Sequence, residues 1–173
     1  MTKNCPTNLS LKENDMHYLV RLIVKAQDAE EAKSVAETTM DDLVEWREFD
    51  WYTPDGLDSR WEDCWQPMKL SNKKAQASAL SAMEGQFEEF KRTMDSIRLM
   101  MNRYTDEQIY NEEFEQVDGH YLSRYQFSKA SGYHGNTCQL FGPDCDSIIS
   151  QSGLEYYLKD PKNLWLVQVD AHN

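Results

Sequence analysis

The chain has no long hydrophobic run, and this absence limits where it can act. No stretch approaches the roughly 18 uninterrupted apolar residues that a membrane span requires. Residues 1–15 are polar and lack the apolar segment of a secretory signal peptide. We therefore expect a flexible N-terminal leader at residues 1–15, a single domain at residues 16–173, no membrane contact and a cytoplasmic location.

Basic residues are also scarce. The 173 residues include 30 acidic and 18 basic ones, which gives a net charge of −12 and opposes direct binding to nucleic acid or to anionic lipid. The acidity is concentrated in two segments. Residues 28–63 hold thirteen acidic residues against three basic ones, and residues 106–118 hold six acidic residues and no basic one.

The common catalytic and cofactor-binding motifs are missing. The sequence contains no glycine-rich nucleotide-binding loop, no HExxH and no GxSxG. A catalytic Cys–His pair could join Cys64 or Cys138 to His120 or His172, since such partners meet in space and not in sequence. Asp170 and His172 also share one face of a predicted strand. Neither pattern is specific, so we predict no catalytic residue and no cofactor, and an enzyme is the less favoured interpretation.

A zinc site is the main alternative in this chemistry. His134, Cys138 and Cys145 fall in one turn-rich stretch, from His134 to Asp146, together with further aspartates. Zinc prefers three or four imidazole or thiolate ligands, but the paired CxxC spacing of common zinc sites is absent. We therefore predict buried thiols and no metal, and keep a metal-binding protein or enzyme built on this loop as an alternative.

The clearest periodicity in the chain predicts a long helix over residues 72–103. Its apolar residues recur at alternating steps of three and four: Leu80, Met83, Phe87, Phe90, Met94, Ile97, Met101 and Tyr104. We expect the stripe from Leu80 to Ile97 to be buried against the protein's own sheet. The alternative is a contact between copies of the chain along this helix.

The remaining patterns predict an α+β order. They indicate a strand at 17–26, a helix from Asp28 to about Arg47, a short strand at 49–53, a capped helix from Thr105 to about 114, a hairpin joining 120–129 to 137–141, an ambiguous helix at 147–157 and a last strand at 163–172. We predict one α+β domain, loosely ferredoxin-like. It would have an antiparallel sheet of four or five strands, and one long and two or three shorter helices on one face.

Four of the five tryptophans lie between residues 46 and 65, inside the more acidic segment. They either fill the seam between sheet and helix or form part of an interface, because tryptophan is common in both places. On the second interpretation, acidic and tryptophan side chains would bind a partner: Asp41, Asp42, Glu45, Glu48, Trp51, Trp61, Glu62 and Asp63.

The favoured function is a small acidic protein-interaction module. In its sharpest form it is an inhibitor, of the kind that phages and mobile elements encode, which presents a nucleic-acid-like negative surface to a basic, nucleic-acid-binding partner. The alternatives are the metal-binding protein or enzyme described above and a homo-oligomeric structural or regulatory module. The protein itself is expected to be a monomer or a homodimer.

Overall fold

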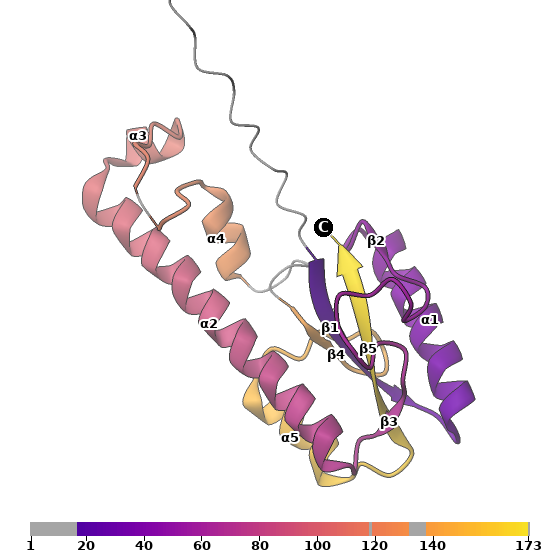
Figure 1. Cartoon of the computed structure of the whole chain (residues 1–173). Helices are drawn as coiled ribbons and strands as arrows, with labels where there is room; N and C mark the ends of the chain where they lie inside the picture. The colour runs from indigo at the N-terminus through magenta and orange to yellow at the C-terminus, as the bar shows by residue number, and fades with distance from the viewer. Residues whose placement is uncertain (1–16, 118, 132–137, 173) are drawn as a thin grey trace, which may run out of the picture.

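Two long antiparallel strands form the centre of the sheet (Figure 1). The computed structural model describes residues 17–117, 119–131 and 138–172. Strand β1 (His17–Lys25) pairs with strand β5 (Leu164–His172) over its whole length, from His17 opposite His172 to Lys25 opposite Leu164. Both strands were predicted, because their apolar and β-branched residues favour a sheet.

Three two-residue strands complete a five-stranded mixed sheet. β2 (Trp51–Tyr52) and β3 (Met68–Lys69) both pair antiparallel with β5, and β4 (Leu140–Phe141) pairs parallel with β1. The strand order is β2-β5-β1-β4, with β3 also on β5. The α+β class and the five strands are confirmed, but the purely antiparallel sheet is wrong at β4.

The predicted hairpin is the reason for that error. Residues 120–129 form no strand and instead enter helix α4 (Tyr125–Ala130), whose aromatic residues Tyr125 and Phe127 are exposed. Their alternation therefore does not mark a half-buried strand. The chain returns to the sheet beside β1, where the backbone N–H of Arg21 donates to the carbonyl of Gln139 at 2.8 Å.

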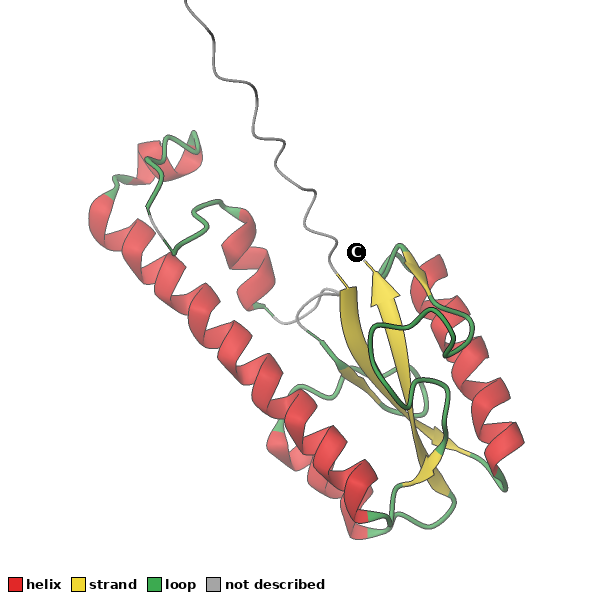
Figure 2. Cartoon of the chain, in the orientation of Figure 1, coloured by secondary structure: helices red, strands yellow, loops and turns green. Residues whose placement is uncertain are grey.

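Helices cover both faces of the sheet, not one (Figures 1 and 2). Val20, Leu22 and Val24 of β1 point to one face and pack in the same cluster as helix α1 (Ala29–Glu45). Ile23 points to the other face, in a second cluster with helices α2 (Lys73–Arg103) and α5 (Gln151–Lys159). Successive side chains of a strand point to opposite faces of the sheet. Because β1 has apolar residues at both odd and even positions, both faces must be buried by helices.

Helix α1 follows its sequence signals closely. The carboxylate of Asp28 accepts a hydrogen bond from the backbone N–H of Glu31 at 2.9 Å and caps the first turn, as predicted. The inner side of the helix is fully buried at its apolar positions, Ala32, Ala36, Met40 and Leu43. The helix ends at Glu45, and Arg47 adopts a left-handed φ of 62° just before the chain returns to the core at Phe49.

Helix α2 lies on the sheet through small and polar residues instead of its large apolar ones. Its buried positions are Ala75, Ala79, Ala82, Gln86, Thr93, Ser96, Ile97 and Met100. By contrast, Phe87 and Phe90 are 60% and 43% exposed. The predicted burial of the whole Leu80 to Ile97 stripe is therefore wrong, although Ile97 itself is buried. The buried seam is displaced by one residue, about 100° around the helix, because alanines allow a closer approach to the sheet.

The far half of α2 projects beyond the sheet. The second core cluster contains residues of α2 only as far as Met83, although the helix continues for about 30 Å after that point. There α4 lies beside it, and α3 (Asp106–Tyr110) follows it (Figure 1). The capping box of Thr105 and Gln108 that opens α3 was predicted. The described residues thus contain four shorter helices, where two or three were expected.

None of the helices in the described ranges is both long enough and apolar enough to cross a membrane.

Candidate functional site

The outward side of α1 carries a row of carboxylates, which we call the acidic face: Glu30, Glu37, Asp41 and Glu45. They are spaced by seven, four and four residues, so they lie on one side of the helix. All four are exposed. None of them forms an ion pair with another residue that the structure describes.

One member of the acidic face also has a structural role. The hydroxyl of Tyr52 donates a hydrogen bond to the carboxylate of Asp41 at 2.6 Å, which joins α1 to β2. Burial, together with this hydrogen bond and the charges of Asp41 and Glu37, holds the pKa of Tyr52 well above its usual range. Tyr52 therefore remains a neutral donor.

Two tryptophans near the end of α1 reach solvent. Trp46 is 59% exposed and Trp51 is 45% exposed, and the Trp51 ring stacks on His172 with centroids 5.0 Å apart. Trp46 was not among the predicted partner-binding residues. The sequence left open whether this tryptophan is buried or exposed, and in the structure it follows the last residue of α1, just before the left-handed Arg47.

The structure divides the predicted partner-binding residues into two groups. Asp41, Asp42, Glu45 and Glu48 lie on or just after α1, with Trp51 in the following strand, and Asp42 and Glu48 are half-buried. Trp61, Glu62 and Asp63 lie in the loop between β2 and β3, where they line a hollow of about 540 Å³ whose wall includes Lys33 from the start of α1. Of these three, Glu62 is exposed and Trp61 packs against the core.

One of the two carboxylates of the loop group is in an ion pair. Asp63 pairs with Lys74 at 2.7 Å, which links the loop to the first turn of α2. The loop is also closely folded, because a Cβ atom at Gly56 would lie 2.8 Å from the carbonyl oxygen of Cys64. Trp65 is buried and its indole N–H donates to the carbonyl of Thr53 at 2.5 Å, so this tryptophan fills the seam.

Of the zinc alternative, His134 lies outside the described residues. Cys138 is buried, its Sγ lies 3.2 Å from the carbonyl of Leu140, and burial raises the pKa of its thiol. Burial likewise raises the pKa of the half-buried Cys145, which disfavours the thiolate that zinc requires. Within the described ranges, no three His, Cys, Asp or Glu side chains are grouped as metal ligands would be.

Asp170 contacts a histidine of the other long strand, β1. Its carboxylate, which is fully buried, contacts Nδ1 of His17 at 2.6 Å and accepts from the backbone N–H of Arg60 at 2.8 Å. Arg21 is buried on the same face, and this burial lowers its pKa to about 10. Its guanidinium donates to the carbonyl of Leu19 at 2.7 Å. The two contacts of Asp170 hold the strand ends and the loop together.

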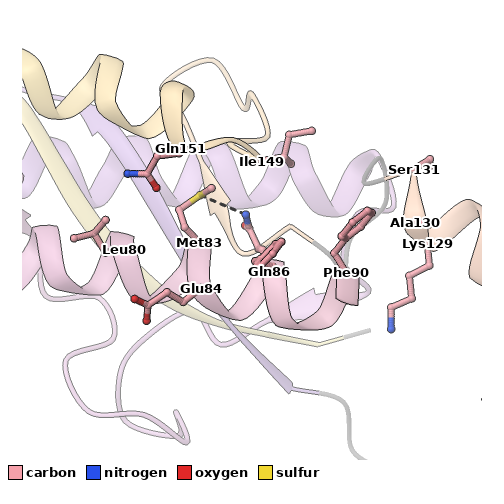
Figure 3. Close-up of a pocket in the computed structure, with 11 residues that line it drawn as sticks. Leu80, Met83, Glu84, Gln86, Phe90, Lys129, Ala130, Ser131, Ile149 and Gln151 are labelled. Carbon is pink, nitrogen blue, oxygen red and sulfur yellow. Dashed lines mark hydrogen bonds between the residues drawn. The ribbon is translucent and has the colours of Figure 1, made fainter. Parts of the chain in front are cut away.

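A second surface lies on α2, opposite the acidic face. We call it the apolar groove (Figure 3). It has a volume of about 530 Å³ and lies between α2, the end of α4 and the start of α5. Its apolar lining comes mainly from Leu80, Met83, Phe87, Phe90 and Ile149, and Glu84 and Lys129 lie at its rim.

Gln86 forms the floor of the groove and ties α2 to the sheet. Its buried amide oxygen accepts from the backbone N–H groups of Gln139 at 2.7 Å and Leu140 at 3.1 Å. Its amide nitrogen donates to the carbonyl of Ile148 at 3.0 Å and to the sulfur of Met83 at 3.5 Å. Nothing in the sequence distinguished this glutamine from the exposed polar residues of the helix.

Comparison with known protein families shows the family to which the chain belongs. Residues 16–173 match the family model described as Domain of unknown function (DUF7995), and the chain belongs to this family. A search of curated proteins finds no match. No solved structure matches either.

Proposed function

We propose that this protein is an interaction module that binds a basic protein surface through the acidic face of α1, with Trp46 as the apolar anchor. One observation carries the proposal. Four exposed carboxylates in a row, with no cation paired to them among the described residues, lie on the helix that ends at a 59% exposed tryptophan.

The two parts of this surface do different work in the proposed complex. Unpaired carboxylates attract a basic partner over about 10 Å at moderate salt, so they raise the association rate. A tryptophan that leaves water on binding slows dissociation, because large aromatic side chains dominate the energetics of most interfaces. The protein's net charge of −12 has the same sign as the acidic face and strengthens the attraction.

The nucleic-acid-like version of this proposal requires a higher density of negative charge. Carboxylates four residues apart are about 6 Å apart along a helix axis, whereas one DNA strand carries a phosphate about every 3.4 Å. A single row therefore has roughly half the charge density of a DNA strand. Mimicry requires the flanking acidic residues as well, among them Asp42 and Glu48, which lie beside the row.

The test reverses charge on the acidic face without touching the Asp41 hydrogen bond. A variant with Glu30→Lys, Glu37→Lys and Glu45→Lys keeps the fold, since all three side chains are exposed. The partner is captured from a cell extract, identified and purified, and its association rate is measured against salt concentration. We expect the variant to associate at least tenfold more slowly at low salt and to lose most of the salt dependence.

The matched control makes the same change in charge elsewhere, with Glu113→Lys, Asp144→Lys and Glu155→Lys, three exposed positions outside α1. We expect it to retain most of the wild-type rate, and Trp46→Ala to raise the dissociation rate with little change in association. Equal rates and equal salt slopes for the wild type and the α1 variant would overturn the proposal. Competition by duplex DNA for the same partner tests the nucleic-acid-like version.

A further inference from the structure

The apolar groove leaves large side chains of α2 in contact with water. Leu80 is 39% exposed, Phe87 60%, Phe90 43% and Ile149 52%. They line one continuous hollow, and the described part of the chain does not cover it (Figure 3). An exposed apolar surface of this kind, with polar residues at its rim, is typical of a protein–protein contact.

The charge of α2 allows a second copy to approach. The whole protein has a net charge of −12, and two copies would repel each other at the acidic face. Helix α2 is different, since it carries six basic residues and four acidic ones. It lies on the other face of the sheet from α1, so contact between copies along α2 keeps their acidic faces apart.

The outer stripe of α2 is also complementary to itself when it is read backwards. Leu80, Glu84, Phe87, Lys91 and Met94 follow one another at steps of four, three, four and three residues. In reverse, the order is again apolar, charged, aromatic, charged and apolar, with the signs of the two charges exchanged. An antiparallel second helix centred on Phe87 therefore places each Glu84 next to the Lys91 of the other copy.

The side chains in this stripe are available for that contact. Glu84 is exposed and has no ion pair among the described residues. Lys91 is exposed and can change partners, since its hydrogen bonds to the Glu88 carboxylate, at 2.9 and 3.1 Å, both lie at the surface. It also lies over the Phe87 ring, with Nζ 5.5 Å from the centroid, so the cation is already beside the aromatic residue at the centre.

We propose that a second copy of this chain docks antiparallel on α2, with the twofold axis at Phe87 and the Phe87 and Phe90 rings of each copy entering the groove of the other. Such a contact is isologous, because the same patch serves both copies. The contact centres on one face of one helix, so we expect a dimer that is reversible and depends on concentration. The proposal does not depend on the function of the acidic face.

Sedimentation velocity on the full chain over a range of concentrations measures the dimer directly. We expect a shift from monomer to dimer as the concentration rises. Glu84→Lys places two lysines together at each end of the contact and should raise the dissociation constant about tenfold or more, and Lys91→Glu should do the same with two carboxylates.

Mixing the Glu84→Lys and Lys91→Glu variants tests whether residues 84 and 91 of the two copies are in contact. In a heterodimer, the lysine introduced at position 84 of one chain faces the glutamate introduced at position 91 of the other. At the opposite end of the contact, the native Lys91 of the first chain faces the native Glu84 of the second. We expect the mixture to form heterodimers although each variant alone is monomeric. The Glu30, Glu37 and Glu45 reversals of α1 serve as the control and should leave the dimer intact.

Three results would overturn the proposal. One is a wild-type chain that stays monomeric at several hundred micromolar. Another is a dimer whose dissociation constant is unchanged by Phe87→Asp. The last is a pair of single variants whose mixture dimerises no better than either alone. Circular dichroism of each variant separates loss of the contact from loss of the fold.

Discussion

Helices α1 and α2 cover opposite faces of one sheet in opposite ways. α1 turns its apolar residues inward, with Met40 fully buried, and leaves unpaired carboxylates outside. α2 turns alanines and the polar Gln86 inward and leaves Phe87 outside. The charges on α2 are balanced by pairs three residues apart, such as Asp95 with Arg98 at 2.8 Å. Burial of one helix is therefore mainly hydrophobic, while the other depends on close approach and on a buried amide.

The first prediction introduces leucine on both helices. Gln86→Leu leaves two backbone N–H groups and one carbonyl without the bonds that the amide supplies, and we expect a loss of about 2–5 kcal/mol in the free energy of unfolding. Met40→Leu conserves volume in an apolar core and should cost less than about 1.5 kcal/mol. Urea unfolding of both variants measures the difference, and a smaller loss for Gln86→Leu would contradict this account of α2.

The second prediction concerns the exposed side of α2. A charge at Phe87 would cost several kcal/mol if this ring were in a core, but the ring is 60% exposed. We expect Phe87→Asp to change the free energy of unfolding by no more than about 0.5 kcal/mol at a concentration where the chain is monomeric. Thermal or urea unfolding checks the value, and a loss of several kcal/mol would mean that the helix buries its large stripe after all.

The third prediction, with the smallest effect, sharpens the contrast in charge. Glu45→Lys places a cation in the last turn of α1, four residues after Asp41, where α1 has no basic residue, and should stabilise the protein by about 0.3–0.5 kcal/mol. Asp95→Lys removes the pair with Arg98 and should destabilise it by a similar amount. Both changes in the free energy of unfolding should become smaller at high salt. Two shifts of the same sign would show that the helices do not differ in this respect.

Local signals in the sequence were reliable for the elements and less so for their partners. The two long strands, the Asp28 cap and the Thr105 capping box depend on neighbours in the chain, and all are present. Pairing of β4 with β1 joins residues more than a hundred positions apart, and no local pattern encodes it. The same holds for the carboxylate of Asp170, whose contact with His17 joins residues 153 positions apart.

The candidate surfaces show the same division. The acidity of residues 28–63 is visible in the sequence, and α1 duly presents a row of carboxylates. Trp46 was missed because its exposure depends on where α1 ends and on the left-handed Arg47. The apolar groove was missed because helical periodicity shows that a stripe exists and does not show whether it is covered.

Residue type and spacing within single segments were therefore enough to establish the α+β class, the length of α2 and the sign and position of the charge. The side of α2 that faces the sheet follows instead from packing between distant parts of the chain. That choice depends on how closely two surfaces can approach: alanines at positions 75, 79 and 82 fit against the sheet, Gln86 satisfies backbone groups from elsewhere in the chain, and the larger residues beside them remain outside.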